Sequence, residues 1–204
     1  INGKQMVVKV GVPGFHVINN CLSVLAIVQA IGGDVSLAGI SFSKMQLPEG
    51  RGNRLKLFTG DGEVELIDES YNASPVSMKA ALRLLGQSKI KNNGRRIAVL
   101  GDMLELGGRS LSFHQDLCAY IKDECIDMVF CSGELMKSLF QVLPKDIYKE
   151  WYSESNELTA SIISKLRSGD VIMVKGSFGS KMRLVVEGIE KFYKKRIDLD
   201  RGLN

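Results

Sequence analysis

The chain has 204 residues, of which 45% are apolar and 25% are charged, and its formal net charge is +4. These proportions are ordinary for a globular protein. No apolar run approaches the roughly 20 residues of a membrane-spanning helix, so we expect no membrane insertion.

The cysteines and the basic residues argue against further classes of protein. Four cysteines and two histidines are too scattered for a disulfide framework or a metal cluster, and such thiols fit a reducing cytosol. Basic residues gather at 89–96 and 191–196, mostly beside turns or at a helix end. We interpret these clusters as solvated surface and expect no nucleic-acid partner.

The chain begins at Ile1 in the middle of a pattern, and we interpret it as a piece of a longer protein. Residues 1–47 have the pattern of the end of one domain, and residues 48–204 that of a second. Apolar spacing and glycine signals predict four segments in the first part. These are a strand (6–10), a helix (16–31), a second short helix (36–45) and a linker (47–50).

The second part opens with a predicted β-hairpin, because two alternating segments flank Gly60-Asp61-Gly62. Six polar or small residues follow the second strand. They end at Ser74-Pro75, a helix cap followed by proline at the first helical position. The helix that begins there places Met78, Leu82 and Leu85 on one face.

Strands then alternate with helices to residue 194. The predicted strands are 96–101, 127–131, 149–152 and 171–175. This rhythm predicts an α/β fold with a Rossmann-like, mainly parallel sheet and flanking helices. Because parallel strands end at one edge, we expect Asp68–Asn72, Asp102 and Ser177 to converge there.

The residues alone leave the chemistry of this edge open. Asp102 and Glu105 could position a substrate or a neighbouring loop, or cap the next helix. Gly176 and Gly179 lie between a strand and a helix, where backbone N–H groups can hold an anion. The loop is neither a Walker A sequence nor a dinucleotide fingerprint, so alone it is a weak signal.

One segment carries a strong resemblance. Asp68-Glu-Ser-Tyr-Asn-Ala-Ser-Pro-Val-Ser-Met78 resembles the DDSYNANPxSM signature of one branch of the Mur ligase family. Three other segments resemble further motifs of this family. They are Gly14–Leu22 (GxHNxxNALAA), Ala98–Gly107 (AVLGDMxELG) and Val174–Met182 (VKGSxGxxM).

The resemblance implies a function for the whole protein. In this branch of the family, an ATP-dependent ligase of peptidoglycan precursor synthesis joins D-Ala-D-Ala to UDP-MurNAc-tripeptide through an acyl phosphate. ATP and Mg²⁺ are the implied cofactors, the implied location is the cytoplasm, and we expect a monomer.

The resemblance also places the chain within the family's architecture. Residues 1–47 would be the end of the central ATP-binding domain, and residues 48–204 the C-terminal domain. The family's Gly-Lys-Thr phosphate loop and metal ligands lie upstream of this part, and the printed sequence contains no such loop. We therefore expect no catalytic or metal-binding residue in this chain and no activity from the chain alone.

Individual roles follow from the matched motifs. On the nucleotide side the resemblance implies Asn20, Arg51 (with Arg54 as second choice), Asp68, Glu69 and Tyr71; on the substrate side it implies Asn72, Asp102, Lys175, Gly176 and Ser177. Glu69 stands where the family has its ribose-contacting aspartate, so either Glu69 or Asp68 contacts the ribose. Val17 replaces the first asparagine of the helix motif, so its contact is lost or supplied otherwise. His16 either has the role that the motif implies or forms a helix-start hydrogen bond with no chemistry.

Two alternatives remain open. The first is a sister Mur ligase that adds a single amino acid, against which the Ser70–Pro75 letters argue. The second is a non-catalytic Rossmann-like binding module, which would be expected to begin at its own Met.

Overall fold

The structure is a computed structural model that describes residues 5–12, 15–46, 49–59, 62–91 and 93–200. The backbone contacts divide the chain into two compact units, Ile1–Pro48 and Glu49–Asn204. We call them unit 1 and unit 2. That they are the end of an ATP-binding domain and a complete C-terminal domain stays a prediction.

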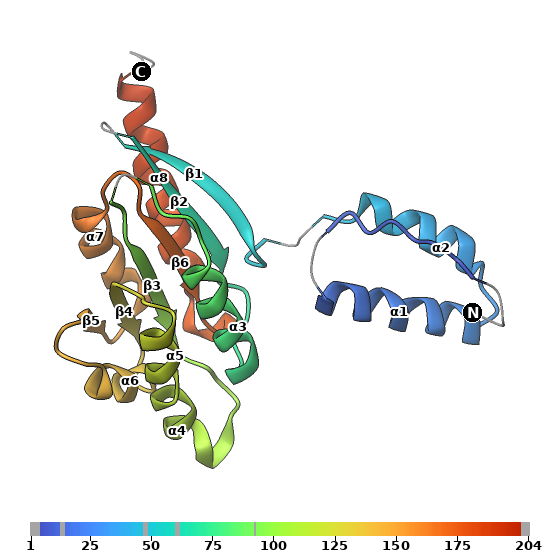
Figure 1. Cartoon of the computed structure of the whole chain (residues 1–204), viewed down its shortest axis with the longest axis horizontal. Coiled ribbons are helices and arrows are strands. Elements are labelled where there is room, and N and C mark those ends of the chain that lie inside the picture. Colours follow the sequence, from blue (N-terminus) through green and yellow to red (C-terminus); the bar gives the residue numbers. More distant parts are fainter. Residues whose placement is uncertain (1–4, 13–14, 47–48, 60–61, 92, 201–204) are drawn as a thin grey trace. The chain divides into compact units, whose positions relative to one another are not determined.

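The regular structure described in unit 1 is helical. It contains α1 (Phe15–Ala30), α2 (Val35–Ser41) and a short 3₁₀ helix, η1 (Phe42–Lys44) (Figure 1). Asp34 caps α2 by accepting hydrogen bonds from the N–H groups of Ser36 and Leu37. The helix predicted over 16–31 is therefore confirmed, whereas the one predicted over 36–45 ends at Ser41 and continues as 3₁₀.

The strand predicted at residues 6–10 is wrong. These residues form neither strand nor helix, and no strand occurs in the described part of unit 1. A strand needs a neighbour to receive its backbone groups. The chain here meets a helical segment instead, and the Gly11 N–H donates to the Phe42 carbonyl at 2.9 Å.

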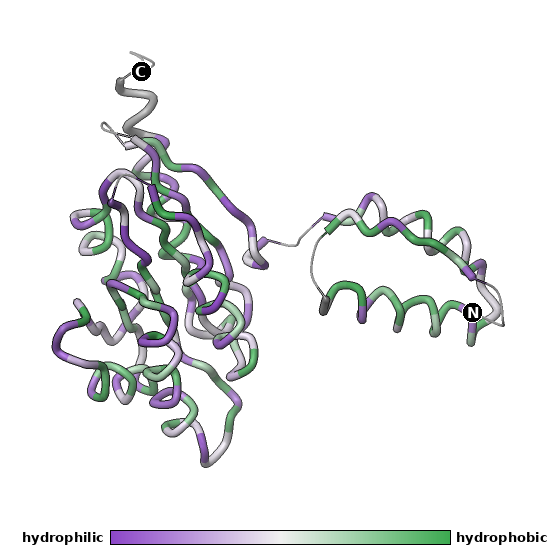
Figure 2. Tube along the Cα trace, viewed as in Figure 1, coloured by the Kyte–Doolittle hydropathy of each residue, from purple (hydrophilic) through white to green (hydrophobic). Residues whose placement is uncertain are grey.

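Unit 1 buries few side chains and exposes many apolar ones. Its buried cluster consists of Val12, Val17, Cys21, Leu25 and Phe42. Figure 2 shows apolar colouring along most of α1. The exposed large apolar side chains of the two helices are Ile18, Leu22, Val24, Ile27, Leu37 and Ile40.

Unit 2 is built on one six-stranded sheet with the order β1-β2-β6-β3-β4-β5. Only β1 and β2 pair antiparallel, and the remaining neighbours are parallel, which confirms the predicted mainly parallel sheet. The strands are β1 (Asn53–Thr59), β2 (Gly62–Glu69), β3 (Arg96–Gly101), β4 (Met128–Ser132), β5 (Tyr148–Tyr152) and β6 (Val171–Lys175).

Helices cover both faces of this sheet (Figure 1). Neighbouring strand residues point to opposite faces, so Ile67 joins one buried cluster and Leu66 the other. The first cluster lies under α3 (Pro75–Gly86), α4 (Ser110–Gln115), α5 (Leu117–Asp123) and α6 (Met136–Val142). The second lies under α7 (Ser155–Lys165) and α8 (Arg183–Asp200). Two 3₁₀ helices, η2 (Gly107–Arg109) and η3 (Phe178–Ser180), lie in loops.

Helix α3 begins as its sequence predicts. Ser74 Oγ accepts the Ser77 N–H at 3.2 Å, and Ser77 Oγ accepts the Ser74 N–H at 2.9 Å, which closes a capping box. The predicted core face is confirmed, because Met78, Leu82 and Leu85 are fully buried. This cap fixes where the preceding polar loop must end.

Two other helix boundaries differ from the prediction. Helix α8 continues to Asp200 rather than ending near Lys194, because neither glycine nor proline interrupts residues 195–200. Helix α6 begins at Met136 rather than Glu134. No helix in the described ranges is long and apolar enough to cross a membrane.

The edge strand β5 is held to α7 by a polar cluster around Glu150. The Glu150 carboxylate accepts hydrogen bonds from Tyr148, Tyr152 and Ser161 and pairs with Lys165 at 3.0 Å. Burial alone would raise the pKa of Glu150, but these hydrogen bonds outweigh it and lower the pKa to about 2.

We expect this cluster to make stability depend on acid pH. Because the folded pKa lies below the ordinary value of 4.5, the contribution is present above pH 4.5 and is lost as the pH falls toward 2. Glu150→Gln should lower the free energy of unfolding at pH 7 by about 2 kcal/mol. The difference from wild type should shrink by pH 3, measured by urea unfolding.

The matched control is Asp146→Asn, an exposed carboxylate in the loop before β5. Its effect should be small at both pH values. A Glu150→Gln effect of equal size at pH 7 and pH 3 would contradict the assignment.

Candidate functional site

Three neighbouring parallel strands end together at one edge of the sheet. Glu69 at the end of β2 pairs in register with Lys175 at the end of β6, and Leu100 of β3 pairs with the same lysine. The segments that follow these strands therefore start side by side (Figure 1). We call them the signature loop (Ser70–Ser74), the serine loop (Gly176–Lys181) and the Asp102 loop (Asp102–Leu106).

The two carboxylates before the signature loop have different environments. Asp68 is 1% exposed, and its carboxylate accepts hydrogen bonds from the Ser70 N–H, the Ser70 hydroxyl and Arg183. The Glu69 side chain is 25% exposed and pairs with Lys175 at 3.2 Å. Glu69 is therefore the carboxylate that can meet a ligand, whereas Asp68 is committed inside the fold.

Lys175 ties the signature loop to β6. Its side chain is 3% exposed, and its ammonium donates to the Glu69 carboxylate and, at 2.8 Å, to the Asn72 carbonyl. Burial lowers the pKa of Lys175, and the Glu69 carboxylate opposes that shift. The ammonium is thus placed to hold the loop rather than to project from it.

Ser177 joins all three loops. Its backbone N–H donates to the Asp102 carbonyl at 3.0 Å, and its hydroxyl accepts the Leu104 N–H at 2.9 Å. The same hydroxyl lies 3.4 Å from the Ala73 carbonyl. Ser177 is 6% exposed, so its side chain is committed to protein groups.

The backbone of the serine loop packs closely against the end of β3. A Cβ at Gly176 would lie 2.3 Å from Ser180 Oγ, 2.5 Å from Met182 Cγ and 3.1 Å from the Cα of Gly101, the last residue of β3. A glycine is required here by close approach. The glycine therefore allows the serine loop to pass close to the end of β3.

Asp102 caps a helix, but not the one that follows it in the chain. Its carboxylate accepts the N–H groups of Met136 at 2.7 Å and Leu135 at 3.3 Å, at the start of α6. Burial raises the pKa of Asp102, and these two hydrogen bonds lower it in part. Gly133 makes room for the carboxylate, which would lie 2.4 Å from a Cβ there.

The buried side chain of His114 holds the Asp102 loop by a hydrogen bond to its backbone. Its Nε2 accepts the Met103 N–H at 2.9 Å, and its Nδ1 lies 2.6 Å from the Ser110 carbonyl. These contacts fit a neutral ring protonated on Nδ1. The histidine is fully buried and acts within the fold.

Aromatic and cationic side chains lie exposed beside the signature loop. Arg51 stacks over the Tyr71 ring at 4.5 Å, and Tyr71 meets Phe178 with ring centroids 6.0 Å apart. Tyr71 is 44% and Phe178 78% exposed. A planar group or a phosphate could meet this cluster without rearrangement of the sheet.

The structure thus brings together nine of the ten predicted residues. Asn20 lies in α1 of unit 1, with its side chain exposed, and Asn72 is also exposed. Asn72 Oδ1 accepts the Ala73 N–H at 2.8 Å, which shapes the loop.

Three residues escaped the sequence analysis: Phe178, His114 as a loop support, and Arg183. The sequence holds a signal for Phe178 alone, because an apolar residue beside a glycine in a loop can be exposed. The roles of His114 and Arg183 depend on partners that are distant in the chain.

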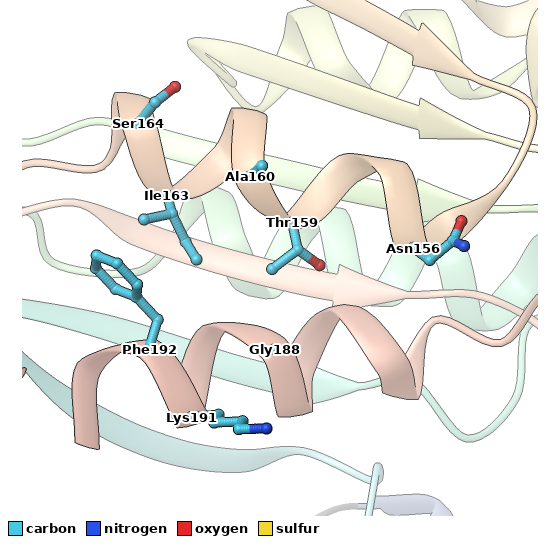
Figure 3. Close-up of a pocket in the computed structure, with 8 residues that line it drawn as sticks. All are labelled: Asn156, Thr159, Ala160, Ile163, Ser164, Gly188, Lys191 and Phe192. Atoms are coloured by element: carbon cyan, nitrogen blue, oxygen red, sulfur yellow. The ribbon is translucent and has the colours of Figure 1, made fainter. Parts of the chain in front are cut away.

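A groove lies elsewhere, between α7 and α8. Its volume is about 550 Å³, and Ile163 and Phe192 point toward one another across it (Figure 3). The remaining lining residues are Asn156, Thr159, Ala160, Ser164, Gly188 and Lys191. None of them belongs to the three loops.

The chain matches a known protein family over most of unit 2. Residues 53–178 match the family described as "Mur ligase, glutamate ligase domain". UDP-N-acetylmuramoyl-tripeptide–D-alanyl-D-alanine ligase from Rickettsia prowazekii is 32% identical over 187 residues, which are 92% of this chain and 40% of that protein. The ligase of the same name from Bacillus subtilis is 36% identical over 141 residues, which are 68% of this chain and 30% of that protein.

A solved structure agrees with the sequence matches. The crystal structure of MurF ligase from Thermotoga maritima in complex with ADP is 25% identical to the chain, with a TM-score of 0.60. The match covers 84% of this chain and 37% of that protein. The chain therefore spans at most about 40% of the length of the relatives that it matches.

The cap on α6 predicts different effects for the two acidic residues of the Asp102 loop. Asp102→Ala leaves the buried N–H of Met136 and the partly buried N–H of Leu135 without their acceptor, and it should lower the free energy of unfolding by about 2–3 kcal/mol. Glu105→Ala is the matched control, since Glu105 is exposed. Urea unfolding of both variants tests this, and equal effects would contradict the cap.

Proposed function

This chain belongs to the Mur ligase family, and we propose that it is the C-terminal part of a ligase that joins D-Ala-D-Ala to UDP-MurNAc-tripeptide. The observation that carries the proposal is the signature Asp68–Met78. It begins at the end of β2, at the edge of the sheet where the three loops start side by side. The names of the relatives at 32% and 36% identity support the same substrates.

The proposed reaction uses ATP, which supplies the phosphoryl group that activates the tripeptide carboxylate. The amine of D-Ala-D-Ala then attacks the acyl phosphate, an amide bond forms, and phosphate leaves. Phosphoryl transfer of this kind depends on positioning and on charge neutralisation. The role of this chain is to position the two substrates rather than to cleave the nucleotide.

The residues of the sheet edge suit the nucleotide side. Glu69 is the exposed carboxylate of the pair, so we assign the ribose hydroxyls to Glu69 and not to Asp68. We propose that the Tyr71 ring contacts the base of the nucleotide. The Arg51 guanidinium, which lies over that ring at 4.5 Å, would contact a phosphate. By the family resemblance, we propose that Asn20 of unit 1 contacts the adenine of the nucleotide.

The implied Mg²⁺ is the remaining cofactor of the proposed reaction. No group of three His, Cys, Asp or Glu side chains in the described ranges could hold a metal ion. From the family resemblance, we propose that Mg²⁺ is held upstream of this chain, in the part of the protein that also supplies the Gly-Lys-Thr loop.

The serine loop suits the acceptor side. We propose that its backbone receives the carboxylate of D-Ala-D-Ala, while Lys175 and Ser177 hold the loop in place through their contacts with the neighbouring loops. We propose that Asn72 and Asp102 also shape the site for D-Ala-D-Ala. Asn72 does so by its hydrogen bond within the signature loop, and Asp102 by its hydrogen bond to the start of α6. The whole enzyme would act in the cytoplasm, as a monomer.

Ser177→Ala tests the acceptor side in the whole ligase. It removes the acceptor for the Leu104 N–H, so the KM for D-Ala-D-Ala should rise about tenfold. The KM for ATP should stay within about twofold. Ser164→Ala is the control, because that hydroxyl donates only to a carbonyl of its own helix. An unchanged KM for the dipeptide would remove Ser177 from this role.

A panel of acceptors tests the function itself. The whole ligase should use D-Ala-D-Ala and should not use single amino acids, measured as phosphate release with UDP-MurNAc-tripeptide present. A preference for one amino acid would identify a sister ligase of the family instead.

The chain alone should have no ATP turnover, because its sequence contains no phosphate-binding Gly-Lys-Thr loop. Phosphate release by the purified 204-residue chain, compared with a heat-inactivated sample, measures this. Turnover above that background would mean that the chain holds catalytic groups of its own.

A further inference from the structure

We infer that Arg183 is a positioning residue of the candidate site, which fixes the segment Glu49–Gly52 against the signature loop. We call this segment the joint, because it opens unit 2 directly after the boundary at Pro48. Arg183 is the first residue of α8 and lies 115 positions from Asp68 in the chain. The inference deepens the proposed function and depends on it only for its kinetic readout.

Each nitrogen of the guanidinium faces a different carboxylate. Nη1 lies 2.8 Å from Asp68, Nη2 lies 3.3 Å from Glu49, and Nε lies 3.0 Å from Glu187. A planar fork with fixed donor directions can make three such contacts at once, whereas a lysine ammonium presents a single charged point. Arg183 therefore connects the joint, the base of the signature loop and its own helix.

Of the three contacts of Arg183, we expect the one with Asp68 to contribute most to stability. Asp68 is 1% exposed, and a buried carboxylate without a cation is costly. Its other oxygen accepts the N–H and the hydroxyl of Ser70. The orientation of Asp68 thus sets the first turn of the signature loop.

Backbone hydrogen bonds also connect the joint to Asp68 and to the signature loop. The Gly52 N–H donates to the Asp68 carbonyl at 2.8 Å, and the Tyr71 N–H donates to the Gly50 carbonyl at 3.1 Å. Gly50 has φ +74, and a Cβ there would lie 2.8 Å from the Tyr71 nitrogen. Arg51, between these two glycines, is consequently placed over the Tyr71 ring.

Several carboxylates surround Arg183, so loss of its positive charge should be unfavourable. Glu190 of α8 lies near the same group, and its pKa is raised by burial and by the carboxylates of Asp68, Glu187 and Glu49, against the effect of Arg183. Loss of the guanidinium would leave these carboxylates facing one another. The joint would then separate from the signature loop, and Arg51 would lose its place over Tyr71.

Amide hydrogen exchange on the chain itself tests this inference. In Arg183→Gln, the amides of Gly52 and Tyr71 should exchange at least about tenfold faster, because their acceptors lie in the segments that Arg183 joins. The amide of Val99 in β3 should be unchanged and reports that the sheet is folded. Arg83→Gln is the control, since it removes another surface arginine that pairs with a carboxylate.

A second variant covers a failure to fold. Asp68→Asn combined with Arg183→Gln removes the buried charge together with its partner, and it should give the same faster exchange at Gly52 and Tyr71. Unchanged exchange at both amides in either folded variant overturns the inference.

Kinetics of the whole ligase separate positioning from stability. Arg183→Gln should raise the KM for ATP about tenfold while the KM for D-Ala-D-Ala stays within about twofold. Arg183→Lys should restore only part of the loss, and Arg83→Gln should match wild type. Equal changes in both KM values would indicate a general structural effect and overturn the role. If the wild-type ligase does not use D-Ala-D-Ala, the proposed function fails while the exchange result stands.

Discussion

The parallel pairing of β2, β6 and β3 is the constraint on which the candidate site depends. It brings Glu69, Lys175 and Leu100 to one level, although β6 begins 70 positions after the end of β3 in the chain. Loops that leave adjacent strands at one level must share backbone and side-chain partners. Ser177, which contacts the other two loops, is the clearest case.

A consequence is that many polar residues of the family motifs contact one another. Asp68, Lys175, Asp102 and Ser177 are almost fully buried and hydrogen-bonded within the fold, whereas Glu69, Tyr71 and Arg51 keep surface for a ligand. Buried polar groups need such partners to avoid a large desolvation cost. The motif is therefore as much a description of how the loops are held as of what they bind.

The sequence was sufficient for the sheet, because strand and helix periods and the Ser74-Pro75 cap are local signals. The convergence of Asp68–Asn72, Asp102 and Ser177 was predicted because parallel strands end at one edge, whereas the individual roles came from the family resemblance and stay predictions. The division of these residues into buried and exposed roles was not readable, since it depends on partners such as Arg183 and the start of α6. The wrong strand at residues 6–10 has a related cause, because apolar alternation does not show whether a neighbouring strand exists.

The exposed apolar side chains of unit 1 matter for handling the chain. Ile18, Leu22 and Ile27 lie on the surface of α1, and Leu37 and Ile40 lie on that of α2. Water contact at such a surface is unfavourable, so we expect copies of the chain to associate through it. Aggregation on storage or concentration should accordingly begin at unit 1 while the sheet of unit 2 is still intact, and detergent or a shortened chain that starts at Glu49 should suppress it.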